Sequence, residues 1–245
     1  MNSTATQNRP ANREQYRNGY CTPELRKAMR DAIADYSGRI MDGEQLQLSV
    51  SPGNRKTGFI PSVSLMPYIT CPAACKGTCD GLRYAGKLCA IYKTTLNSYA
   101  RNTAIWQSRP DYYFQVVKSV AIQNRFFRYH VAGDIPNADY FNRMVQTAIE
   151  CPDTTFLCFT KRYNVVNSYI DNSGPLPRNL KVLLSGWHNL KPANPHNLPE
   201  TTVYKRHEVP SEDWLLCGGN CSECSCRGCG CWKAESGETI AFEIH

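Results

Sequence analysis

The chain has 245 residues, a formal net charge of +7, 42% hydrophobic residues and 13 cysteines. These values indicate a globular domain with an appendage and exclude a low-complexity or disordered chain. No apolar run is long enough to span a membrane, and the polar residues 1–20 contain no hydrophobic signal region. We therefore expect a cytoplasmic protein without membrane contact, in which the thiols stay reduced and clustered thiols favour metal over disulfides.

The charge is uneven, with a net +12 over residues 1–206 and a net −5 over residues 207–245. A basic body of this kind can attract nucleic acid or an acidic partner protein. However, no block of Lys and Arg and no recognised nucleic-acid-binding motif concentrates the charge. A solvated basic surface is therefore favoured over a nucleic-acid groove.

The N-terminal residues 1–40 are expected to form a polar arm followed by an amphipathic helix. Thr22-Pro23 is typical of a helix start, and apolar residues then recur at helical spacing up to Gly38, the expected end. The alternating residues 46–50 and the apolar run 60–65 predict two strands before the first cysteines.

Strands and helices alternate in the middle of the chain. Helices are expected over 88–106, 112–123, 138–150 and 165–171, and strands over 126–131, 155–159, 181–184 and 202–204. Such alternation is typical of a parallel sheet covered by helices. We predict an α/β fold with an incomplete (β/α) barrel-like parallel sheet over 41–206 and a cysteine-rich, metal-binding C-terminal lobe over 207–245.

Polar residues follow several of these strands. Parallel sheets place their functional groups just past the carboxyl ends of the strands, which predicts a site for a small polar ligand here. Its candidate residues are Gly133, Asp134, Thr160, Lys161 and Ser185. Asp134 fits equally well as a helix N-cap, Lys161 as an exposed cation, and the nearby His130 as a hydrogen-bonded core histidine.

Three thiols at intervals of four follow the apolar run that ends near residue 70: Cys71, Cys75 and Cys79. Structural zinc usually shows paired knuckles, whereas the thiolate cage of an iron–sulfur cluster accepts wider spacing. The spacing therefore favours a 4Fe-4S cluster over zinc. Its fourth ligand would be Cys89, a more distant cysteine or a non-protein ligand.

A second group of thiols lies close to the end of the sequence. Six cysteines within fifteen residues exceed what one tetrahedral ion or one cluster uses. We expect four of them to hold a second metal centre, either iron–sulfur or zinc: Cys217, Cys221, Cys224, Cys226, Cys229 and Cys231. The isolated Cys21, Cys151 and Cys158 are expected to act as small buried hydrophobic residues.

Two resemblances add to this interpretation. The cysteine triplet followed by Ala132-Gly133-Asp134, Thr160-Lys161-Arg162 and Ser185 resembles the order of motifs in the radical S-adenosylmethionine superfamily. In that superfamily three cysteines spaced C-x3-C-x2-C hold a 4Fe-4S cluster at the mouth of a TIM-barrel-like core. The resemblance implies S-adenosylmethionine as a cofactor, although the third cysteine stands one residue later here.

The chain is also similar, over about residues 45–232, to uncharacterised bacteriophage and mobile-element proteins of the "gene product eighty-eight" type. The matching segments are Ile60–Ser64, the start at Cys71, His130–Asp134, Thr160–Tyr163 and Cys231-Trp232. This resemblance implies a phage or prophage origin, metal binding and a location in the cytoplasm of an infected or lysogenic bacterium.

Together these features predict a phage-type iron–sulfur protein with one or two 4Fe-4S clusters, a redox or enzymatic role and an electron-transfer partner. The alternative is a zinc-stabilised binding module that contacts nucleic acid or a host protein.

Overall fold

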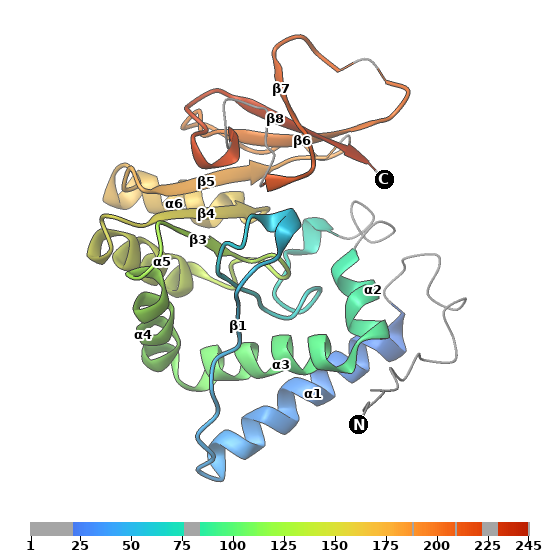
Figure 1. Ribbon diagram of the computed structural model, residues 1–245, viewed down its shortest axis with the longest axis vertical. Helices are drawn as coiled ribbons and strands as arrows, with labels where there is room; N and C mark the ends of the chain where they lie inside the picture. Colours follow the sequence, from blue (N-terminus) through green and yellow to red (C-terminus); the bar gives the residue numbers. More distant parts are fainter. Residues whose placement is uncertain (1–21, 76–83, 188, 209, 222–229, 245) are drawn as a thin grey trace, which may run out of the picture.

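An eight-stranded sheet forms the centre of the molecule in the computed structural model (Figure 1). The structure describes residues 22–75, 84–187, 189–208, 210–221 and 230–244. The expected polar arm and Cys21, Cys79, Cys224, Cys226 and Cys229 lie outside these residues.

The strands are paired in the order β1-β2-β3-β4-β5-β6-β8-β7. Only the first pair, β1 with β2, is antiparallel, and every other pair is parallel. The prediction of an α/β fold with a mostly parallel sheet is therefore confirmed. The strands are β1 Val50–Ser51, β2 Ser62–Val63, β3 Phe126–Tyr129, β4 Thr155–Thr160, β5 Leu180–Ser185, β6 Glu200–Lys205, β7 Trp214–Cys217 and β8 Thr239–Ile244.

Helices connect the strands in the first two thirds of the chain. Among the described residues, no helix combines the length and the apolar character needed to cross a membrane. The α-helices are α1 Pro23–Met41, α2 Tyr84–Ile91, α3 Lys93–Ser108, α4 Pro110–Ala121, α5 Ala138–Glu150 and α6 Tyr163–Ser173, and the 3-10 turns are η2 Arg55–Thr57, η3 Ala73–Cys75 and η5 Gly230–Trp232.

Local capping explains several of these boundaries. The Thr22 hydroxyl accepts a hydrogen bond from the Leu25 N–H at 3.1 Å, and Pro23 occupies the first turn of α1. The expected end of this helix at Gly38 was wrong. The helix continues to Met41 because Gly38 keeps a helical conformation, so that Ile40 packs in the core.

Other boundaries also differ from those expected. The strand expected over 46–50 is reduced to the two residues of β1, Val50–Ser51. The helix expected over 88–106 is two helices, α2 and α3, because Tyr92 between them is extended and exposed. The last two strands were not foreseen, and β8 lies between β6 and β7 within the sheet. Residues 207–245 thus contribute two strands to the same sheet as the preceding region, and the predicted division into separate domains stays a prediction.

The two faces of the sheet are covered differently. Side chains of α1 and α3–α6 pack with alternate strand residues such as Phe127, Phe156 and Val182 in one large core. On the other face, Leu157 and Leu183 belong to a smaller cluster with Trp232 and Ile240 from the C-terminal segment. The chain therefore closes one face with helices and the other with its C-terminal residues.

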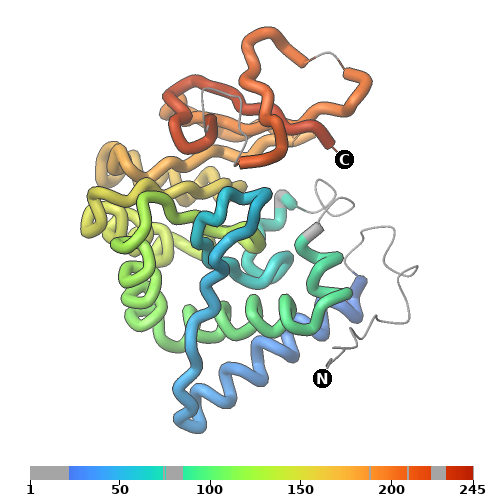
Figure 2. The backbone as a smooth tube through the Cα atoms, viewed as in Figure 1, coloured from blue at the N-terminus to red at the C-terminus, as the bar shows by residue number. Residues whose placement is uncertain are grey.

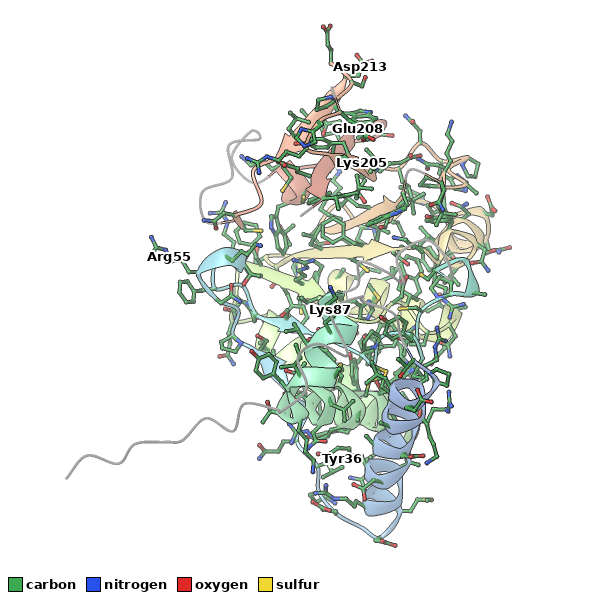
Figure 3. The ribbon with its side chains drawn as sticks, turned by 90° about the vertical axis from the view of Figure 1, so that its right-hand side faces the viewer. Tyr36, Arg55, Lys87, Lys205, Glu208 and Asp213 are labelled. Atoms are coloured by element: carbon green, nitrogen blue, oxygen red, sulfur yellow. The ribbon has the colours of Figure 1, made fainter. Side chains whose placement is uncertain are left out.

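The N-terminal helix and the C-terminal strands lie at opposite ends of the molecule. Figure 2 shows α1 and α3 at one end and the segment containing β6–β8 at the other. Figure 3 likewise places Tyr36 of α1 far from Lys205, Glu208 and Asp213. The C-terminal segment therefore reaches the middle of the sheet from the end opposite α1.

Candidate functional site

A cavity of about 340 Å³ lies against the face of the sheet that the helices do not cover. Seven of the eight strands contribute to its wall. The strand residues that line it are Ser62 of β2, Arg128 of β3, Leu157 and Phe159 of β4, Ser185 of β5, Thr201 and Val203 of β6, Cys217 of β7 and Phe242 of β8. This cavity is a candidate ligand site because ligands bind in concave, largely apolar pockets with a few polar groups.

Aromatic side chains form much of the cavity wall. Phe159 and Phe242 meet edge to face, with ring centroids 6.1 Å apart. Trp232 of η5 packs against Phe126, with ring centroids 5.0 Å apart, and Trp187 follows β5. The wall therefore offers flat apolar surfaces of the kind that contact planar ligands.

One cationic side chain lies within the wall. The Arg128 guanidinium carbon stands 5.1 Å from the centroid of the Phe159 ring. Its Nε is buried, and among the described residues no atom accepts a hydrogen bond from it. None of the described residues that line the cavity is Asp or Glu. Among the described residues, the positive charge of Arg128 thus has no carboxylate counterpart in the cavity wall.

Two of the sequence-predicted ligand residues, Lys161 and Ser185, meet beside the cavity. The Lys161 Nζ donates a hydrogen bond to Ser185 Oγ at 2.6 Å and lies 5.9 Å from the centroid of the Trp187 ring. Ser185 and Trp187 both line the cavity. The structure therefore brings Lys161 and Ser185 together, as expected for neighbouring carboxyl ends of parallel strands.

Asp134, by contrast, is part of an internal hydrogen-bond network. Its Oδ1 accepts hydrogen bonds from Thr160 Oγ1 at 2.5 Å and from the Ile135 N–H at 2.7 Å, and its Oδ2 accepts one from the Lys161 N–H at 2.9 Å. Burial raises the pKa of the Asp134 carboxyl, and these hydrogen bonds oppose that rise. The carboxylate thereby ties the end of β3 to the end of β4.

Gly133 is required by the backbone at this position. Its φ is +82°, and a Cβ there would lie 2.7 Å from the Leu65 carbonyl oxygen. Only glycine fits here, because other residues rarely adopt this φ and because a Cβ would clash with the Leu65 carbonyl oxygen. Gly133 therefore lets the chain pass beside the segment after β2 and turn Asp134 toward Thr160.

His130 lies in the core beneath the helices and not in the cavity. Its Nε2 is 3.0 Å from the Tyr140 hydroxyl, which is 2.7 Å from the Tyr113 hydroxyl. Burial lowers the pKa of His130 to about 3, so the imidazole is neutral near pH 7. Of the two roles that the sequence left open, the hydrogen-bonded core histidine is the one observed.

The first cysteine group follows β2 at the carboxyl edge of the sheet. Cys71 is half-buried, Cys75 ends η3 and is buried, and Cys89 on α2 packs with the helical core. Within the described ranges, no three His, Cys, Asp or Glu side chains form a group able to hold a metal ion. Cys79 lies outside the description, and the ligand set therefore stays a prediction.

Three of the terminal cysteines line the cavity: Cys217 at the end of β7, Cys221 and Cys231. The Gly219 N–H donates to Cys217 Sγ at 3.4 Å, and Gly219 itself has a φ of +75°. A backbone N–H directed at a cysteine sulfur favours the thiolate, which is the form that binds metals. The donor chemistry of this turn therefore fits a thiolate metal centre.

Two cysteines have the structural role expected of them. Cys151 and Cys158 are buried, and desolvation raises the pKa of both thiols. A neutral buried thiol behaves as a small apolar side chain. These two residues are suitable controls for any experiment on the clustered thiols.

Arg128 is the residue of the candidate site that the sequence interpretation missed. Its signal was a cation in the middle of the aromatic strand Phe126–Tyr129. A charged residue is almost never buried unless it has a partner, so this position was informative. The cavity that Arg128 lines is partly formed by β7 and β8, and these strands were not predicted. The cavity could therefore not be inferred from local sequence pattern.

Comparison with known proteins gives one family. The model of the family described as Gene product 88 matches residues 40–227. No curated protein and no solved structure matches the chain. The matched range covers the first cysteine group, the Asp134 network and Arg128. It agrees with the phage-type resemblance found in the sequence and shows no resemblance to the radical S-adenosylmethionine superfamily.

Proposed function

The chain belongs to the Gene product 88 family, and from that premise we propose that it is a phage-type iron–sulfur protein with a redox or enzymatic role. Its first 4Fe-4S cluster would be held by Cys71, Cys75 and Cys79 with one further ligand. The described cysteines of this set follow β2 at the carboxyl edge of the sheet, where α/β proteins place their functional groups. A cluster there would supply one-electron transfer.

The observation that carries the proposal is the placement of Cys217, Cys221 and Cys231 on the wall of one cavity. Four of the six terminal cysteines would hold a second metal centre, and the Gly219 N–H would help to keep Cys217 as a thiolate. Metal binding would also supply folding free energy to a segment with few apolar residues.

The cavity would be the interior of an incomplete barrel. Support comes from its wall, to which strands from β2 to β8 all contribute. Lys161 and Ser185 would contact a polar ligand beside the cavity, while Gly133, Asp134 and Thr160 would hold the strand ends in shape. An electron-transfer partner and the cytoplasm of an infected or lysogenic bacterium complete the proposal.

Metal analysis of the full chain purified without oxygen tests this function. We expect iron, acid-labile sulfide and a visible absorption band. Cys75→Ser should lower the iron content, and the matched control Cys151→Ser, which changes another buried cysteine, should not. A colourless protein without iron or sulfide would contradict the proposal. Reductive cleavage of S-adenosylmethionine by the iron-loaded protein would identify an enzyme of the radical S-adenosylmethionine type.

The second candidate is a zinc-stabilised module that binds nucleic acid or a host protein. The net charge of +12 over residues 1–206 favours it. It requires zinc in place of iron, together with retention on DNA or RNA that weakens steeply as salt is raised. An iron-loaded protein that ignores nucleic acid at low salt would exclude it.

A further inference from the structure

We propose that the cavity binds a small organic anion, a carboxylate or phosphate carried on a planar ring, with Arg128 as the residue that binds its charge. The anion would bind to the strands and the aromatic wall, so this proposal does not require the proposed metal, although Cys217, Cys221 and Cys231 line the same cavity.

The first argument is the unsatisfied charge of Arg128. A buried polar group without a hydrogen-bond partner costs about 1–3 kcal/mol, and native proteins keep few of them. The Nε of Arg128 is such a group among the described residues, and no described carboxylate lines the cavity to balance the guanidinium. Because a guanidinium presents paired N–H groups, its natural partner is a carboxylate or a phosphate.

The second argument is the additional positive charge of Lys161, which contacts the lining residue Ser185. The Lys161 Nζ donates to a neutral hydroxyl, that of Ser185, and not to a carboxylate at that contact. The Lys161 ammonium group has three N–H donors, so it can donate a further hydrogen bond to a ligand oxygen near Ser185. Arg128 in the wall and Lys161 beside Ser185 therefore both favour negative charge in the cavity.

The third argument is the shape of the remaining wall. Phe159, Trp187, Trp232 and Phe242 line the cavity, and its wall also includes small polar residues such as Ser62, Ser185 and Thr201. A volume of about 340 Å³ stands at the lower end of the range for small-molecule pockets. A ring system with a short acidic arm suits this space, and stacking on the aromatic wall would orient it.

Calorimetric titration of the full chain with two matched pairs of probes tests the proposal. One pair is indole-3-acetate and indole-3-acetamide, and the other is phenyl phosphate and phenol. At least one anion should bind about tenfold more tightly than its neutral partner, the difference expected for one charge-assisted hydrogen bond. The anion with the larger advantage identifies a carboxylate or a phosphate ligand.

Two variants test whether the tighter binding of the anion depends on Arg128. Arg128→Gln should reduce the advantage of the anion to less than about twofold. The matched control is Arg125→Gln, because Arg125 is exposed on the same segment and also lies over a ring, that of Phe126 at 5.3 Å. It should keep the full advantage of the anion.

A cavity-filling variant keeps the test valid if Arg128→Gln folds poorly. Val203→Phe adds a ring inside the cavity and should abolish binding of both anions without lowering the unfolding temperature. The proposal is overturned if neither anion binds better than its neutral partner, if both arginine variants lose the advantage equally, or if Val203→Phe binds normally.

Discussion

The two faces of the sheet differ in the charge of the buried polar groups that they leave unpaired. Beneath the helices, His130, Tyr140 and Tyr113 form a chain of hydrogen bonds inside a continuous aromatic core. On the cavity face, Arg128 of β3 has a buried Nε, and no described atom accepts a hydrogen bond from it. The helical face leaves one neutral group, the buried Tyr129 hydroxyl, without a hydrogen-bond partner among the described residues, whereas the cavity face leaves the Nε of a charged guanidinium in that state.

This difference indicates which face stabilises the fold and which face binds. Buried polar groups that are fully paired rigidify a core, and one that is unpaired costs stability until a ligand arrives. Proteins commonly lose stability at functional sites in this way. The predictions below change one face at a time, beginning with the largest expected effect.

Phe156 and Phe159 test the comparison on a single strand, β4. Phe156 is fully buried among Phe127 and Tyr129 of the helical core, whereas Phe159 is half-buried at the cavity. Phe156→Ala should lower the free energy of unfolding by about 3–5 kcal/mol, and Phe159→Ala by less than half as much. Chemical denaturation measures both, and equal losses would mean that the cavity face is as tightly packed as the other.

His130 makes the helical face sensitive to acid. Its pKa is lowered from 6.5 to about 3 in the folded protein, so below pH 6.5 the unfolded chain binds a proton that the folded chain cannot. Stability should therefore fall as the pH drops, by about 2 kcal/mol between pH 8 and pH 5 from this residue. Tyr140 and Cys158, which face the imidazole, stay neutral throughout because burial raises the pKa of each.

His130→Asn is the matched variant for this prediction. Asparagine accepts the positive φ of +57° at this position and does not titrate. Urea unfolding at a series of pH values should show a shallower loss of stability toward acid in the variant than in the original chain. If the stability of both proteins fell equally with pH, His130 would not be the source of the acid sensitivity.

Asp134 stands where the two faces meet. Asp134→Asn replaces one acceptor oxygen by an amide, which faces the Lys161 N–H as a second donor. We expect a loss of about 1–2 kcal/mol in the ligand-free protein. Thr160→Val should give a comparable loss by removing the hydroxyl that donates to Asp134 Oδ1. If neither variant lost stability, Asp134 would not be a structural residue, and the predicted ligand-binding role would be favoured.

Arg128→Met gives the smallest effect and the opposite sign. An apolar side chain of similar length removes the unpaired buried Nε, so the ligand-free protein should gain up to about 1 kcal/mol. Thermal unfolding measures this gain. A clear loss of stability would show that the guanidinium already has an adequate environment and that the cavity face needs no ligand.

The sequence predicted the central elements of the fold because their signals are local. Helix α5 was expected over residues 138–150 and found there, with Asn137 as the N-cap. The strands β3, β4 and β5 were recognisable as apolar runs that follow helices. The strands β7 and β8 were missed because a cysteine-rich segment lies between them and each is paired with residues distant in sequence.

The candidate site also has one part that the sequence predicted and one part that it did not. The meeting of Asp134, Thr160, Lys161 and Ser185 followed from parallel strands, whose carboxyl ends share one edge. The cavity could not be predicted, because Phe242 reaches it through strand pairing and Trp232 through packing against Phe126, and no local pattern encodes either contact. The same holds for Arg128, whose position was visible in the sequence but whose surroundings were not.

The place of β8 in the sheet has a consequence for the order of assembly during synthesis. Because β8 separates β6 from β7, β7 has no described neighbour in the sheet until residues 239–244 have left the ribosome. The six terminal thiols are translated before that moment, while the strand that fixes their segment is still missing. Assembly of the cavity therefore waits for residues 239–244, and a chain that stalls before residue 239 would lack the strand with which β7 pairs.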